Sequence, residues 1–134
     1  QARLSPPLLG QIVAEASIST PEEYMKYVYD EYLRRRDFLI KRLNEIPGVY
    51  SPMPMGAFYT VAALPVEDAD HFCKWCLDEF DLDGDTVFMA PASGFYTTPG
   101  EGRNQVRLAY VHNIDYLARA MDVLEAALAT YPGT

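Results

Sequence analysis

The stretch Gln105-Val106-Arg107-Leu108-Ala109-Tyr110-Val111 decides how the rest of the chain is interpreted. It is rich in β-forming residues, and its polar and apolar side chains alternate as they do along a half-buried strand. Alternation places Arg107 on the face opposite Val106 and Leu108. We therefore predict a strand over residues 105–111 that carries a single cation in an otherwise apolar run.

Helix signals precede this strand at the start of the chain. Ser5-Pro6-Pro7 is a typical helix entry, and the apolar residues that follow up to Ala16 recur at helical spacing. Thr20-Pro21-Glu22-Glu23 has the form of a capping box, with Thr20 as the cap and Pro21 at the first helical position. It predicts the longest helix, which ends before Pro47-Gly48.

The middle and end of the chain alternate between short apolar runs and helix patterns. We predict strands over residues 57–63 and 86–90, a long loop over 91–102, and helices capped by Asp68 and Asn113. The order helix, helix, strand, helix, strand, strand, helix indicates an α/β fold, bordering on α+β. We expect a small sheet of about three strands covered by helices.

Composition limits the classes of partner. A chain of 134 residues fits one domain, and 19 acidic against 11 basic residues give a net charge of -8. Such a surface repels phosphate backbones and anionic lipids, so neither nucleic acid nor membrane is expected as a partner. The two cysteines do not form a disulfide framework, which favours a reducing, cytoplasmic location.

Arg107 is the main candidate for a binding residue. A planar guanidinium can form a bidentate contact with the carboxylate of a small acid, which fixes both its position and its orientation. The alternative is a structural arginine that pairs with a core carboxylate or extends to the surface. Taken without further information, the structural alternative is the more common of the two.

Other patterns fall short of a site. His71, Cys73 and Cys76 contain half of a zinc motif, but both cysteines lie on the predicted apolar stripe of their helix. The acidic residues at 81, 83 and 85 resemble the opening of a calcium loop, although the required glycine and closing glutamate are misplaced. We expect no metal site. The only lysines, at 26, 41 and 74, lie in charged helical surroundings, so no complete active site is expected.

Four motifs in order resemble the small domain of class I/II aminotransferases, the fold type I branch of pyridoxal-phosphate (PLP) enzymes that includes aspartate aminotransferases. They are Tyr32-Leu33-Arg34-Arg35-Arg36-Asp37, Gly56-Ala57-Phe58-Tyr59, Phe88-Met89-Ala90-Pro91-Ala92-Ser93-Gly94-Phe95 and Val106-Arg107-Leu108-Ala109-Tyr110. The resemblance covers nearly the whole chain. It implies a C-terminal fragment, with residues 1–19 as an inter-domain helix and residues 20–134 as the small domain.

The resemblance implies that Arg107 binds the α-carboxylate of the substrate, an amino acid or a 2-oxo acid. It also implies that Gly56–Tyr59 enters near the cleft and that the Pro91–Phe95 turn precedes the carboxylate-binding strand. The Schiff-base lysine and the groups that hold PLP belong to the large domain in this family. The fragment is thus expected to have no catalytic or cofactor-binding residue and no activity alone, while the intact enzyme is expected to be a homodimer.

Two alternatives remain open at this stage. Lyases, decarboxylases and synthases of the same fold also orient an amino acid before a bond at Cα is broken. A stand-alone module could instead use Arg107 to sense a carboxylate ligand, or to satisfy a buried acid, without any catalysis.

Overall fold

The computed structural model describes residues 5–133, which form parts of two compact units, Gln1–Glu31 and Tyr32–Thr134. Helix α2 (Glu22–Glu45) contributes its first residues to the first unit and residues 32–45 to the second. The predicted division into a helix over residues 1–19 and a domain over residues 20–134 stays a prediction.

The first unit holds helix α1 (Leu8–Ser17) and the beginning of α2. Both predicted helices are present, but α2 begins at Glu22, after Pro21, and the Thr20 hydroxyl donates a hydrogen bond to the Ser17 carbonyl over 2.6 Å. That hydroxyl serves the end of α1. No residue of α1 is buried, although Leu8, Leu9, Ile12 and Val13 form its apolar stripe.

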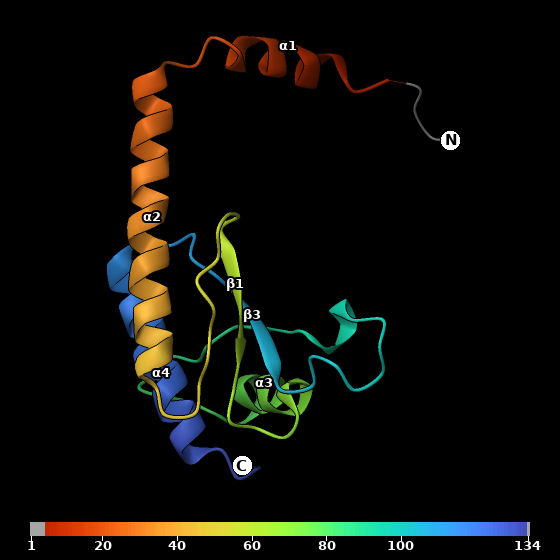
Figure 1. The fold of residues 1–134 in the computed structure, drawn as a ribbon, viewed down its shortest axis with the longest axis vertical. Coiled ribbons are helices and arrows are strands. Elements are labelled where there is room, and N and C mark those ends of the chain that lie inside the picture. Colours follow the sequence, from red (N-terminus) through yellow and green to blue (C-terminus); the bar gives the residue numbers. More distant parts are fainter. Residues whose placement is uncertain (1–4, 134) are drawn as a thin grey trace. The chain divides into compact units, whose positions relative to one another are not determined.

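The second unit is built around a three-stranded antiparallel sheet in the order β1-β3-β2. Figure 1 shows its two longer strands, β1 and β3, side by side. The central strand is β3 (Gln105–Ala109), and the strand beside it is β1 (Tyr59–Ala63). On the other side of β3 lies β2, which has only two residues, Ala90–Pro91. The predicted small sheet of about three strands is therefore confirmed, and its antiparallel pairing gives the α/β unit an α+β character.

The strand predicted over residues 86–90 is wrong for most of its length, because only Ala90 belongs to β2. The preceding residues are held by other contacts. The Thr86 hydroxyl donates to the Cys76 carbonyl, while Val87 and Met89 are buried in the core. Their apolar character, which suggested a strand, reflects packing rather than participation in the sheet. Similarly, β1 begins only at Tyr59, after Ala57 adopts a positive φ of 63°.

Three helical segments cover one face of the sheet. They are residues 32–45 of α2, helix α3 (Ala69–Asp78) and helix α4 (Ile114–Thr130). The predicted caps of α3 and α4 are confirmed: Asp68 accepts from the His71 amide and Asn113 from the Tyr116 amide. Fully buried side chains from these helices and the sheet make one core, among them Leu39, Leu43, Phe72, Val106, Tyr110, Met121 and Leu124.

The opposite, outer face of the sheet is the more open one. Burial alternates along both long strands, so that Thr60, Ala62, Val106 and Leu108 are buried while their neighbours are half-buried or exposed. The predicted alternation around Arg107 is thus confirmed. Across residues 5–133, no helix combines the length and the apolar character needed to cross a membrane.

Candidate functional site

Arg107 lies in the middle of the central strand and points to the outer face. Its cross-strand neighbours are Val61 on β1 and Ala90 on β2, neither of which carries a polar side-chain atom. Within residues 5–133, the guanidinium forms no ion pair and no side-chain hydrogen bond. The structural alternative in which Arg107 pairs with a core carboxylate is therefore not what the described residues show.

Two aromatic rings lie next to this guanidinium. Its Cζ atom lies 5.4 Å from the centroid of the Tyr59 ring and 5.1 Å from that of Phe95. Both distances are within the range in which the electron-rich ring face attracts a cation. Tyr59 pairs with Ala109, so its ring reaches Arg107 diagonally across the outer face of the sheet.

The backbone around Tyr59 is held by Tyr110, a buried residue at the end of β3. The Tyr110 amide donates to the Phe58 carbonyl over 2.9 Å, and the Tyr110 hydroxyl donates to the Ala57 carbonyl over 3.1 Å. Burial raises the pKa of this hydroxyl, so it remains a protonated donor at neutral pH. The segment that delivers the Tyr59 ring is thus anchored to the strand that carries Arg107.

Phe95 is presented by a short 3₁₀ turn, η1 (Ser93–Phe95), which follows β2. The turn is fixed at its start because the Ala92 amide donates to the Gln105 carbonyl over 2.9 Å. It is also tied to α3, since the Ser93 hydroxyl donates to an Asp70 carboxylate oxygen over 2.6 Å. The 3₁₀ turn lies inside the stretch that was predicted as loop, and it places Phe95 beside Arg107.

A shallow cavity of about 230 Å³ lies on the outer face of the sheet, and Arg107 is not among the residues that line it. Gln105, two positions before Arg107 on β3, forms part of its wall, and so does Val61, which pairs with Arg107. The Tyr96 hydroxyl donates to the Gln105 side-chain oxygen over 2.7 Å. This cavity gives a bound molecule room on the same face as the guanidinium.

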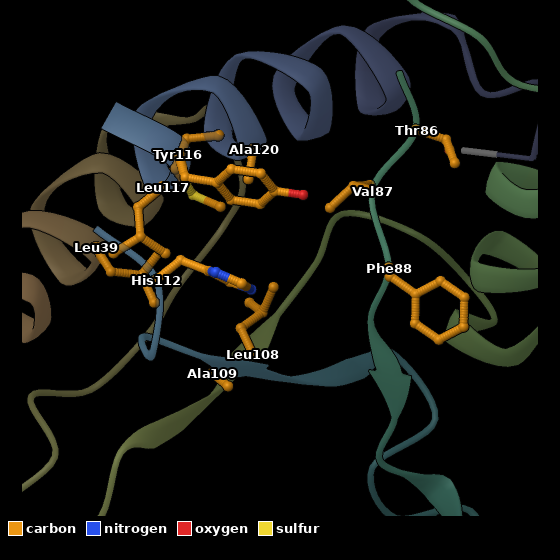
Figure 2. A pocket seen from close by; sticks show the side chains of 11 residues that line it. Leu39, Thr86, Val87, Phe88, Leu108, Ala109, His112, Tyr116, Leu117 and Ala120 are labelled. Atoms are coloured by element: carbon orange, nitrogen blue, oxygen red, sulfur yellow. The ribbon is translucent and has the colours of Figure 1, made fainter. Parts of the chain in front are cut away.

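A second cavity, of about 190 Å³, lies where β3, the segment after residue 85 and the start of α4 meet (Figure 2). Its walls are mainly apolar and include Val87 and Leu108, which belong to the core. His112 and Tyr116 form a ring pair there, with centroids 4.5 Å apart. Figure 2 shows the Phe88 ring turned away from that pair. Arg107 is not among the residues that line this cavity.

The weaker candidates have structural partners. Cys73 and Cys76 are buried, free thiols on the apolar face of α3, and desolvation raises their pKa values to about 11 and about 12. His71 shares a hydrogen bond of 2.5 Å with the Tyr131 hydroxyl. No group of three or more metal-ligating side chains occurs among residues 5–133.

The acidic turn is tied to α4. Arg119 donates to an Asp85 carboxylate oxygen over 2.8 Å and forms an ion pair with Asp83 at 3.6 Å. The hydrogen bond to Asp85 is the main reason that the pKa of Arg119 is raised. The turn therefore joins the end of α3 to α4 rather than forming a calcium loop.

Sequence reasoning singled out Arg107 as a candidate but missed its two ring neighbours as a set. Tyr59 fell within the segment expected near the cleft and Phe95 within the turn expected before the carboxylate-binding strand, yet nothing in the sequence showed that both rings reach one guanidinium. The diagonal contact of Tyr59 depends on the β1–β3 register, and that of Phe95 depends on the 3₁₀ turn. Neither feature can be read from local patterns.

Known proteins similar to this chain are aminotransferases, although no protein-family model matches it. An aspartate aminotransferase from Pyrococcus horikoshii is 32% identical over 117 residues, which is 86% of this chain and 27% of that protein. The structure of an alanine aminotransferase from Pyrococcus furiosus is 31% identical, with a TM-score of 0.78, over 95% of this chain and 31% of the other.

A third similarity concerns the fold. The α-aminoadipate aminotransferase LysN from Thermus thermophilus, complexed with N-(5'-phosphopyridoxyl)-L-leucine, has a TM-score of 0.79 at 24% identity. The match covers 96% of this chain and 32% of that one. The chain spans about a third or less of the length of the curated relatives it matches. Sequence and structure agree, and we conclude that the chain is a domain of the fold type I aminotransferase kind.

Proposed function

We propose that this chain is the C-terminal small domain of a PLP-dependent aminotransferase, which transfers an amino group between an amino acid and a 2-oxo acid. The similar proteins support this, because several are named aspartate aminotransferase and the matches span 86–95% of the chain in three of them. The intact enzyme is proposed to be a cytoplasmic homodimer whose large domain holds the cofactor. The cysteine content supports that location, because Cys73 and Cys76 lie too close in sequence to form a disulfide framework.

Within this enzyme, we assign to Arg107 the binding of the substrate α-carboxylate. The observation that carries the assignment is an exposed guanidinium on a central strand with no anionic partner in the described part of the chain. A carboxylate can accept two parallel hydrogen bonds from such a group. Because the arginine is held on a strand, it fixes the orientation of the amino acid as well as its position.

The lysines of this chain do not fit the Schiff-base role that the cofactor requires. Lys26 is paired with Asp30 and Lys41 with Glu45, in both cases on the exposed surface of α2. Lys74 is exposed on α3. None lies in the desolvated surroundings that lower the pKa of a lysine so that it can form a Schiff base. We therefore assign no step of the cofactor chemistry to this chain. Its proposed contribution is to bind the carboxylate of the substrate through Arg107.

The test uses the full-length protein with Arg107→Ala and Arg107→Lys. Loss of a charge-assisted bidentate contact is expected to lower kcat/KM for L-aspartate or L-alanine on the order of 10- to 150-fold, mainly through KM. The absorbance of the bound cofactor is expected to remain. Arg103→Ala is the matched control, because it also removes an exposed arginine. The Arg103 guanidinium already has an anionic partner, since its Nε atom lies 3.7 Å from an Asp68 carboxylate oxygen. Unchanged kinetics in both Arg107 variants would contradict the assignment.

Two further measurements separate the alternatives. The coding DNA upstream of Gln1 is expected to continue through a large domain with a strand-end lysine, whereas a start codon at that point favours a stand-alone carboxylate sensor. Product analysis then distinguishes transamination from elimination or decarboxylation, because only transamination transfers the amino group to a second 2-oxo acid, whereas elimination releases it as ammonia and decarboxylation leaves it on an amine.

A further inference from the structure

The way in which Arg107 is held is unusual for a cation on a sheet. An arginine is commonly fixed by a carboxylate, which occupies two or more of its five N–H donors. Here the described neighbours of the guanidinium are two rings, Tyr59 and Phe95, which offer π-electron faces instead of charged oxygen atoms. A cation–π contact attracts the charge but leaves the in-plane N–H groups available.

The two rings approach from different sides of the central strand. Tyr59 belongs to β1, the strand on one side of β3, whereas Phe95 belongs to the turn that follows β2 on the other side. Each ring has its own support, from Tyr110 on the β1 side and from the Ser93 to Asp70 hydrogen bond on the η1 side. The guanidinium is therefore positioned by two independently anchored groups.

Exposure of the rings matches this role. Tyr59 is 41% exposed and Phe95 is 56% exposed, so neither serves mainly to fill the core. An arginine side chain has several rotatable bonds, and ordering it on ligand binding costs entropy. Rings that order it in advance lower that cost and also reduce contact of the cation with water, which strengthens a subsequent ion pair.

We propose that Tyr59 and Phe95 are positioning residues that pre-order the Arg107 guanidinium for a carboxylate ligand without competing for its donors. This rests on the proposed function, because it takes Arg107 as the residue that receives the carboxylate. The two ring contacts also explain how the Arg107 guanidinium is stabilised in the chain when no carboxylate is bound to it. It also predicts that the aromatic character of these residues matters more than their volume.

The direct test measures Arg107 itself. In the full-length protein, 15N relaxation of the Arg107 Nε–H group reports the order of the guanidinium on the picosecond to nanosecond timescale. Tyr59→Leu and Phe95→Leu are expected to lower its order parameter clearly, whereas Tyr59→Phe and Phe95→Tyr are expected to leave it unchanged. Tyr116→Leu is the matched control, because Tyr116 is an exposed aromatic residue on α4 whose ring is not one of the two that form a cation–π contact with Arg107.

The functional test uses the same variants in the full-length protein. Each leucine variant is expected to raise KM for the amino donor by about 2- to 5-fold, with kcat at saturation nearly unchanged and the ring-preserving variants close to wild type. In an Arg107→Ala background, the leucine changes are expected to have no further effect on KM, because the group they position is gone. A merely structural role would not produce this non-additivity.

The outcomes separate the two claims. If Arg107→Ala leaves KM unchanged, the assignment of the substrate carboxylate to Arg107 fails whatever the ring variants do. If Arg107→Ala raises KM but the leucine variants alter neither KM nor the order parameter, the carboxylate role stands and the positioning role is overturned. Equal losses in leucine and ring-preserving variants also overturn it, because the effect would then not depend on a ring.

Discussion

Val61 and Ala90 flank Arg107 across the sheet, and their lack of charge is what leaves the guanidinium available. Directly paired residues on neighbouring strands place their Cβ atoms about 5 Å apart, so a carboxylate at position 61 could reach the arginine. The opposite charge would stabilise the sheet by about 0.2–1 kcal/mol. It would also occupy the N–H donors that we assign to the substrate.

We therefore predict that Val61→Glu makes the domain slightly more stable and the full-length enzyme a weaker binder. Thermal unfolding of the chain is expected to shift upward, while KM for the amino donor is expected to rise. Val61→Gln is the matched control, since it has nearly the same shape without the charge. If the glutamate and glutamine variants behave alike in KM, competition for Arg107 is not the cause.

The buried thiols of Cys73 and Cys76 predict a loss of stability in alkali. Their pKa values are raised from 9.0 to about 11 and about 12 in the folded chain, mainly by desolvation. The unfolded chain therefore releases these protons first, so the free energy of unfolding is unaffected below about pH 9 and falls as pH rises from there through the folded values. The limiting slope is about 1.4 kcal/mol per pH unit for each thiol.

Urea unfolding at a series of pH values between 8 and 11 measures this slope. The double variant Cys73→Ala and Cys76→Ala is expected to have a flatter profile over that range, whatever its stability at pH 8. Tyr110 and Tyr131 also have raised pKa values, mainly because of burial, and both residues are present in both proteins. Tyr110 cancels in the comparison, whereas the pKa of Tyr131 is raised less in the variant because Cys76 is one of the charges that raise it. Parallel profiles would show that the thiols do not titrate as described.

At the scale of the element, the turn between η1 and β3 depends on Gly102. This residue has a φ of +70°, and a Cβ atom there would overlap the Tyr96 ring and lie 3.0 Å from the Ala92 carbonyl oxygen. We predict that Gly102→Ala destabilises the chain by about 1–3 kcal/mol, through the left-handed backbone and the displaced ring. Thermal or urea unfolding measures the change.

Gly100 provides the control for backbone strain. It also has a positive φ, of +86°, but a Cβ atom there would meet no other atom within 4 Å. Gly100→Ala is therefore expected to cost only about 1 kcal/mol, from the backbone conformation. A Gly102 variant no worse than the Gly100 variant would show that the Tyr96 ring moves aside without cost.

Elements with strong local signals were predictable from sequence, whereas the edges of the sheet were not. The caps at Asp68 and Asn113 and the alternation around Arg107 are local features, and the structure has all of them. The prediction of a strand over residues 86–89 was wrong because a buried run of β-forming residues has the same sequence pattern whether it pairs in a sheet or packs against a helix. The contacts between Arg107 and its two rings could not be predicted, because they depend on strand register.

At the scale of the whole chain, apolar surface remains uncovered in both units. In the first unit Leu9 is 77% exposed and Val13 is 68% exposed, and in the second Phe58 and Phe88 are 54% and 83% exposed. Apolar surface of this kind marks a face that another protein part covers. In the proposed enzyme, that part is the large domain.

We predict that the separate chain binds a dye specific for apolar surface, such as ANS, while it is folded. The same measurement on the full-length protein is expected to give a weaker signal per molecule, because the large domain covers part of the surface. A matched pair of circular dichroism spectra shows whether the chain is folded when the dye binds. Equal dye binding by the two proteins would argue that the large domain does not cover these residues.

The pairing of β1 with β3 has a consequence for how the protein is made. Tyr59 pairs with Ala109, and β1 and β2 are each bonded to β3 and not to one another. A nascent chain that has emerged from the ribosome only as far as residue 100 contains the residues of α1, α2 and α3 but lacks the central strand. The sheet therefore cannot form until residues 105–109 have emerged, and Arg107 meets its two rings only in that step.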